Sequence, residues 1–365
     1  MENPANIKPL TSLRFFAALW VVVFHYWPHL AVAGTPPLVA KGYLGVECFF
    51  VLSGFILCHV YLPQFEAGRF KYGDFLWARV ARIYPLHIAT LAAMGLMAGA
   101  AAAIGLPVDP DVLSLRALPA NLAMVQAWGL SPVAGWNHPS WSISAEWFAY
   151  LSFPAFAIAA VTLRRWPRVA VASALALMAL LYVGFARITG FQLTRATISW
   201  GALRIIPCFL LGCALFLAWR ARAADSRKAL AGAAFFGSGA LFSAQFGAPD
   251  MITVSAFGGL IISLAQVSKA GGRLGSHPFF VYLGEISYAV YMVCIPWEVL
   301  FVNLAVKTLH LQSKQLPLPL WLFFTVSLIP VAALAHHLIE KPARDRIKLW
   351  RSAPHLHKLE TLPAR

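Results

Sequence analysis

The chain has 365 residues, of which 60% are apolar and only 12% are charged, and its net charge is +15. Because soluble domains carry about 25% charged residues, this composition excludes an ordinary soluble protein and indicates one that lies mostly in lipid. The positive charges fall between apolar runs, which points to membrane topology instead of nucleic-acid binding. The apolar runs are long and do not alternate with polar residues, so helices are favoured over a membrane barrel.

Apolar runs long enough to cross a bilayer recur along the whole chain, and we expect an all-α polytopic membrane protein with about ten transmembrane helices. The runs cover residues 11–32, 44–63, 83–105, 143–163, 169–188, 200–219, 229–247, 251–268, 279–303 and 318–339. All five cysteines fall inside these runs, which indicates buried thiols and no disulfide framework.

The segments between the runs predict how the chain crosses the membrane. With a cytoplasmic N-terminus, roughly three quarters of the 29 Lys and Arg residues fall on the cytoplasmic segments, as the positive-inside rule requires. We therefore expect both termini to be cytoplasmic. Residues 1–345 are expected to form one integral membrane domain, and residues 346–365 a basic cytoplasmic tail.

The first run contains two ionisable side chains, Arg14 and His25. Eleven residues make close to three whole helical turns, so both side chains share one face about 16 Å apart along the axis. Ionisable residues inside a span are costly and mark function by default. The sequence AVA at 31–33 resembles a leader cleavage site, but the Trp, Tyr and His content of this run favours a retained span.

The second run carries Glu47 near its outer end and Ser53 next to a glycine in its middle. Two roles are open for this pair: Glu47 as the carboxylate that orients His25, and Ser53 as a nucleophile. Helix packing beside the glycine is the favoured explanation of Ser53. The chain has no G-x-S-x-G nucleophile elbow.

Residues 71–87 alternate apolar residues with Arg79 and Arg82, and this pattern predicts a short helix on the cytoplasmic surface, with the third span beginning at Pro85. Two guanidiniums three residues apart share a face and suit either a phosphate ligand or anionic lipid headgroups. Residues 106–140 form the longest expected outer loop.

Further polar side chains lie at the entrances of later runs. Trp141 suits an interfacial anchor, whereas Glu146 lies within the run and is harder to explain by packing. The candidates here are Asn137, His138, Trp141, Ser142 and Glu146, followed by Glu285, Ser287 and Tyr288 in the ninth run and His336, His337 and Glu340 at the end of the tenth. The sequence has no Walker A loop, no H-E-x-x-H motif, no dinucleotide-binding fingerprint and no Cys/His cluster with the spacing of zinc ligands. We therefore expect neither an ATP-driven activity nor a bound metal.

Six motifs in order give the chain a resemblance to the acyltransferase 3 family of integral membrane acyltransferases. They are Arg14 with His25, GVECFFVLSGF (45–55), RVARIYP (79–85), PSWSISAEW (139–147), GEISYAVYM (284–292) and IEKP (339–342). Two features depart from the family pattern: the second-span acid is Glu47 where Asp is also common, and Cys294 and Pro296 stand where many members place a histidine.

The resemblance implies a membrane-embedded O-acyltransferase without a tightly bound cofactor. Its donor would be acyl-CoA, commonly acetyl-CoA, and its acceptor a hydroxyl of an exported or surface carbohydrate or of another small molecule. Arg14 and His25 match the family's essential pair, and Arg79 and Arg82 match its cytoplasmic arginine motif. The expected location is the inner membrane of a bacterium, and the oligomeric state stays open.

The hypothesis that follows makes His25 the general base for the acceptor hydroxyl, with Glu47 behind it. Arg14, Arg79 and Arg82 would bind the CoA phosphates, and Ser53, Trp141, Ser142, Glu146 and Tyr288 are further substrate or structural candidates. Transfer is either direct or through an acyl-enzyme on Ser53 or His25. The alternative is a transporter or flippase of a lipid-linked sugar or small solute with His25 and Glu47 as a proton relay. A non-catalytic export scaffold is disfavoured by the many polar groups within the spans.

Overall fold

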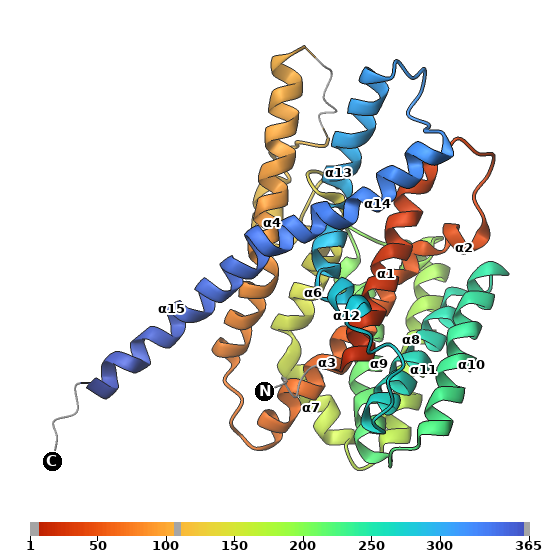
Figure 1. Ribbon diagram of the computed structural model, residues 1–365. Helices are drawn as coiled ribbons and strands as arrows, with labels where there is room; N and C mark the ends of the chain where they lie inside the picture. Colours follow the sequence, from red (N-terminus) through yellow and green to blue (C-terminus); the bar gives the residue numbers. More distant parts are fainter. Residues whose placement is uncertain (1–6, 106–110, 361–365) are drawn as a thin grey trace.

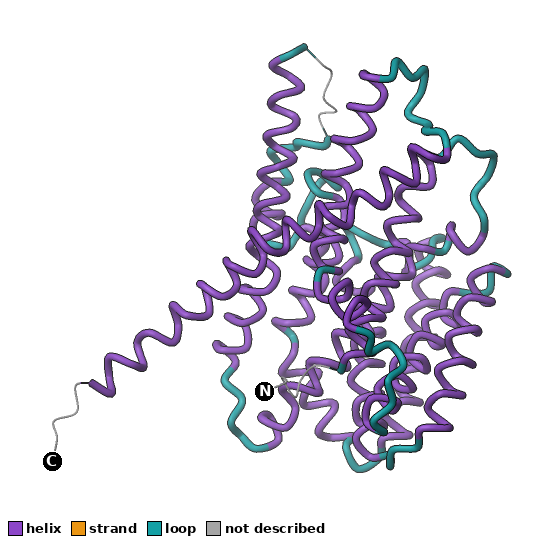
Figure 2. The backbone as a smooth tube through the Cα atoms, in the orientation of Figure 1, coloured by secondary structure: helices purple, strands orange, loops and turns teal. Residues whose placement is uncertain are grey.

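The computed structural model describes residues 7–105 and 111–360, the last of these, 351–360, by backbone alone. This part of the chain is mainly helical and contains no strand (Figures 1 and 2), which confirms the predicted all-α class. Short elements cap or connect the long helices. They are η1 (Trp27–His29), α2 (Pro37–Ala40), η2 (Gly42–Leu44), α5 (Leu118–Leu122), η3 (Gln126–Trp128), η4 (His138–Ser140) and η5 (Leu193–Arg195).

Eight helices in the described part of the chain are long and apolar enough to cross a membrane. They are α1 (Lys8–Tyr26), α3 (Gly45–Glu66), α4 (Tyr72–Ala103), α8 (Pro167–Thr189), α9 (Gly201–Ala221), α11 (Asp250–Lys269), α13 (Ser287–Thr308) and α14 (Leu318–Ala335). A ninth span forms if the bent pair α6 (Trp141–Leu151) and α7 (Phe153–Leu163) counts as one. The remaining predicted run is α10 (Ser226–Gln245), which packs along α11.

The predicted break before the third span is wrong. Residues 72–103 form the single helix α4, which continues through Pro85. A proline within a helix removes one hydrogen bond, here to the carbonyl of Ala81, and need not end the helix. The arginines of this segment turn toward protein partners, as described below, so the segment packs against the bundle instead of lying alone on a lipid surface.

Two other predicted runs are interrupted. The fourth run breaks at Ser152, and the axes of α6 and α7 meet at 59°. The ninth begins with the short helix α12 (Pro278–Glu285), and α13 starts after Ile286. The second break lies between Glu285 and Ser287, which were singled out from the sequence, so these two residues occupy helix ends within the bundle.

Glycine lets the central helices touch backbone to backbone. A Cβ placed on Gly54 of α3 would lie 2.1 Å from the carbonyl oxygen of Phe209, and one on Gly212 of α9 would lie 2.1 Å from that of Val51. Close approach through small residues is a general means of packing helices in lipid. Gly284 of α12 meets the carbonyl of Thr11 in the same way, which fixes the start of α1.

The last two long helices form one continuous rod. α14 passes through a π-helical turn, His336–Glu340, into α15 (Lys341–Glu360), which projects away from the bundle in Figure 1. Trp77 of α4 donates its indole N–H to the carbonyl of Ile347, 2.9 Å away, and so ties the start of α15 to α4. All five cysteines are free and buried, as predicted.

Candidate active site

A cavity of about 130 Å³ lies among α1, α3, α4, α6 and α13. Residues far apart in the sequence meet there because the six motifs lie on helices that pack together. Its walls include Arg14, Ser53, Arg79, Arg82, Ser142, Glu146 and Tyr288, all of which were singled out from the sequence. A mainly apolar cavity with a few convergent polar groups is the usual form of a small-molecule site.

Three guanidiniums converge on this cavity. Arg14 comes from α1, where it has no hydrogen-bond partner among the described residues, and it lies in the field of Glu146 and Arg82. Arg79 donates to the Tyr61 hydroxyl at 3.1 Å, and its Nε is buried without a partner. Three positive charges with donors to spare make a site suited to an anion.

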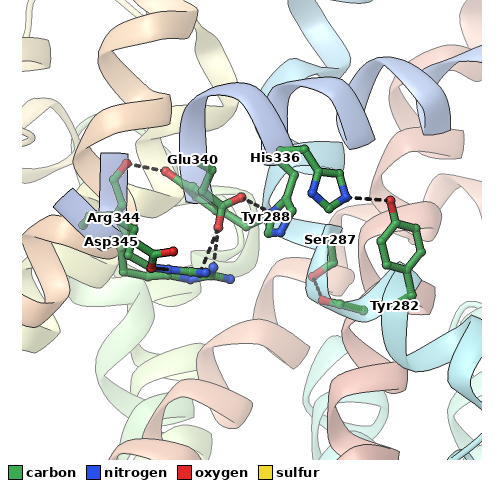
Figure 3. Close-up of polar contacts among 11 residues, drawn as sticks. Tyr282, Ser287, Tyr288, His336, Glu340, Arg344 and Asp345 are labelled. Carbon is green, nitrogen blue, oxygen red and sulfur yellow. Dashed lines mark hydrogen bonds and ion pairs between the residues drawn. The ribbon is translucent and has the colours of Figure 1, made fainter. Parts of the chain in front are cut away.

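Arg82 is held by an acid from the other end of the chain. Its guanidinium pairs with the fully buried carboxylate of Glu340 and stacks on Tyr288, with 5.5 Å to the ring centroid. Figure 3 shows Glu340 facing His336, whose Nδ1 lies 2.9 Å from the second carboxylate oxygen. Arg344 approaches Glu340 to 3.7 Å. The π-turn places Glu340 and His336 on the same inward side, and such turns are frequent at functional sites.

Ser53 and Glu146 form a second polar pair in the cavity wall. The Ser53 hydroxyl donates a short hydrogen bond to the Glu146 carboxylate. A serine nucleophile is activated by an adjacent general base, most often histidine. Among the described residues, no histidine bonds to Ser53, and its hydroxyl donates to Glu146. The contacts therefore favour Ser53 as a partner of Glu146 over Ser53 as a nucleophile.

A Ser53→Ala substitution separates these two roles. Loss of one hydrogen bond to a charged group costs about 1.5–3 kcal/mol, so we expect a reduction in acyl transfer of roughly 10- to 100-fold with no acyl-enzyme detected in either protein. Radiolabelled acyl-CoA followed by denaturing electrophoresis measures both quantities. Label retained on the wild-type protein and lost from the variant would establish Ser53 as the nucleophile.

Glu47 lies away from His25, against a different partner. Both of its oxygens accept from Arg204 of α9, from Nε at 2.5 Å and from Nη2 at 2.9 Å. Arg204 also donates to the carbonyl of Ala196 at 2.8 Å and lies under Trp141, with 4.5 Å to the ring centroid. Both charged side chains are almost fully buried. The predicted contact of Glu47 with His25 is therefore replaced by a bidentate ion pair.

No local pattern indicates this pair, because Arg204 lies near the start of an apolar run. A lone arginine at such a position usually extends toward the membrane surface. Glu47 and Arg204 are 157 positions apart, so no local spacing joins them. Trp141, predicted as an interfacial anchor, is buried on Arg204 instead.

His25 lies beyond the cavity, farther along α1. Gly45 at the start of α3 packs on Ala17, so the outermost cavity residues on α3, Val46 and Phe49, lie at the level of the middle of α1. The next residue, Tyr26, is anchored by its hydroxyl to the carbonyl of Cys294 at 2.8 Å. The His25 imidazole is half-buried and faces His138, with 6.4 Å between ring centroids.

Comparison with known proteins agrees with this arrangement. A family model described as "Acyltransferase domain" matches residues 8–337. "Acyltransferase MdmB" from Streptomyces mycarofaciens is 30% identical over 324 residues, with 79% of this chain and 78% of that protein covered. "Protein 2 in picA locus" from Rhizobium radiobacter is 37% identical over 127 residues, with 35% of this chain and 64% of that protein covered. No solved structure matches the chain.

Proposed function

Because the chain belongs to the acyltransferase 3 family of multi-pass membrane acyltransferases, we propose that it moves an acyl group, most simply acetyl, from acyl-CoA to a hydroxyl of an exported carbohydrate or another exported acceptor. The proposed donor is a co-substrate, and no tightly bound cofactor is required. The proposed location is a bacterial inner membrane, with the arginine end of α1 cytoplasmic, as the distribution of Lys and Arg favours.

The observation that carries the proposal is the convergence of Arg14, Arg79 and Arg82 on one cavity. CoA bears phosphates at one end and the reactive thioester at the other. Guanidiniums bind phosphate in a bidentate manner and stay charged when buried. Among the residues that the structure describes, Arg14 has no hydrogen-bond partner and the Nε of Arg79 is unpaired, so both leave donors for such a ligand.

In this proposal His25 is the general base and lies where the thioester end of the donor would arrive. His25 lies on the same face of α1 as Arg14, about 16 Å farther along the axis, and an extended pantetheine arm covers a distance of this order. An imidazole accepts a proton from a hydroxyl near neutral pH. In this proposal the acceptor approaches from the outer side, beneath the segment that contains α5, η3 and η4.

Lysine substitutions at Arg79 and Arg82 test the donor site. Alanine at position 82 would leave the buried Glu340 carboxylate without its counter-charge. Lysine keeps the positive charge but lacks the planar guanidinium group that binds phosphate through two hydrogen bonds. Since charge-assisted hydrogen bonds contribute about 1.5–3 kcal/mol each, Arg79→Lys with Arg82→Lys should raise the KM for acyl-CoA at least roughly tenfold. The rate of label transfer at increasing acyl-CoA concentration gives this constant.

The matched control replaces Arg165 and Arg168, which are also three residues apart and are exposed outside the cavity, by lysine. This variant should keep the wild-type KM. An unchanged KM in the Arg79 and Arg82 variant would remove the phosphate-binding role from these two residues.

A further inference from the structure

His138 lies opposite His25, and neither imidazole has a hydrogen-bond partner among the residues that the structure describes. Their ring centroids are 6.4 Å apart and the ring planes meet at 72°. Both side chains are half-buried. Three other histidines use a ring nitrogen in a contact with the protein: His29 with Glu298, His87 with the carbonyl of Asn121, and His336 with Glu340. Among the described residues, both ring nitrogens of His25 and of His138 stay available to a ligand.

The backbone on both sides of His138 is fixed by consecutive residues of α13. The Asn137 side chain donates to the carbonyl of Met292 at 2.9 Å, and the Tyr291 hydroxyl donates to the carbonyl of Pro139 at 2.9 Å. Holding a catalytic side chain through its neighbours is how a rigid scaffold keeps it in place without occupying its polar atoms. The sequence placed Asn137 and His138 only at a membrane entrance.

The cavity reaches the segment that carries His138. Tyr291 and Ser142 line the cavity, and the Ser142 hydroxyl lies 2.8 Å from that of Tyr291. Tyr291 is also the residue that holds Pro139. A donor whose phosphates rest on the arginines would thus extend toward the histidine pair.

Asn137 supplies an independent indication of a ligand beside His138. Its side chain is fully buried, and its Oδ1 has no hydrogen-bond partner within residues 7–105 and 111–360. The amide cannot simply be reversed, because its nitrogen must face the carbonyl oxygen of Met292. An unpaired buried acceptor is costly, and a hydroxyl group of a substrate would satisfy it.

We infer, resting on the proposed acyltransferase function, that His138 is a further catalytic residue, whose N–H donates a hydrogen bond to the carbonyl oxygen of the thioester as negative charge develops there. His25 takes the proton of the acceptor hydroxyl, and the hydroxyl oxygen forms a bond to the carbonyl carbon. The carbon–sulfur bond then breaks, and the thiolate receives the proton from His25. His138 keeps its own proton throughout. A neutral imidazole in a half-buried site suits this role, because it donates without bringing a charge.

The test uses membrane vesicles from the native host, which contain the acceptor, supplied with radiolabelled acetyl-CoA. Removal of one oxyanion donor costs about 10²–10³ in kcat, so His138→Ala should lower the maximal rate of label incorporation by this factor and leave the KM for acetyl-CoA unchanged. His138→Gln retains a side-chain N–H, so its maximal rate should be at least tenfold higher than that of His138→Ala. Thermal stability in detergent, measured for both variants, distinguishes this effect from misfolding.

The matched control is His310→Asn, at an exposed histidine remote from the cavity lining, and it should keep the wild-type rate. A wild-type maximal rate in His138→Ala would overturn the inference, and so would a loss confined to the KM for acetyl-CoA. An absence of label incorporation by the wild-type protein is a separate result, because it would overturn the proposed function itself.

Discussion

Replacing His25 by alanine is expected to lower acyl transfer by about 10²–10⁴, the usual contribution of a positioned general base. The protein should still insert and fold, because the imidazole makes no hydrogen bond to any described residue and the helix is anchored next to it by Tyr26. A loss of rate without a loss of stability distinguishes a catalytic group from a packing group. Label incorporation from acyl-CoA and the melting temperature in detergent measure the two quantities.

The control for this substitution is His25→Gln, which keeps the size and polarity of the side chain but cannot accept and release a proton near neutral pH. It should be as inactive as the alanine variant. A glutamine variant with the wild-type rate would mean that His25 acts by hydrogen bonding alone, and the general-base assignment would be wrong.

Replacing Glu47 by alanine is expected to destabilise the folded protein by about 3–5 kcal/mol, because it leaves a buried guanidinium without its counter-charge. Arg204 is 2% exposed and gives two of its nitrogens to this carboxylate. The ion pair joins α3 to α9, and Trp141 of α6 covers it. Thermal unfolding in detergent, followed by circular dichroism, should show a large decrease in melting temperature and a poor yield.

Two variants show whether this loss comes from the buried charge. Glu47→Gln with Arg204→Met removes both charges, and such replacements are often neutral or stabilising, so most of the stability should return. Glu66→Ala breaks a more exposed pair with Arg220 and should cost no more than about 1 kcal/mol. A Glu47→Ala protein with wild-type stability would contradict the structural role and return Glu47 to the list of catalytic candidates.

The helices themselves follow from the sequence more closely than their breaks do. Nine of the ten predicted runs overlap a candidate span or the bent pair, because a long apolar run in lipid has few alternatives to a helix. The sequence does not predict the continuous α4, because the pattern of Arg79, Arg82 and Pro85 indicates a short surface helix with a new span beginning at Pro85. Only the tertiary contacts with Tyr61 and Glu340 show why these arginines lie inside the bundle.

The arginine site was predictable in its members but not in its partners. Arg14, Arg79 and Arg82 were chosen from helical spacing and from motifs, and the structure brings them to one cavity. The acid that pairs with Arg82 is Glu340, 258 positions away. The acid that accepts from Ser53 in the same cavity is Glu146, 93 positions away. Such pairings depend on how helices pack, and hydrophobic periodicity does not specify that. The opposition of His25 and His138 was missed for the same reason.

The most direct test of the account is mass spectrometry of the surface and secreted glycans of cells that carry the wild-type gene, no gene, or the His25→Ala variant. We expect one hydroxyl-bearing surface or secreted component to carry the added mass of an acyl group in wild-type cells alone. Identical acylation in all three strains would contradict it. A component that changes its location but not its mass would also contradict it, because that result describes transport without covalent change.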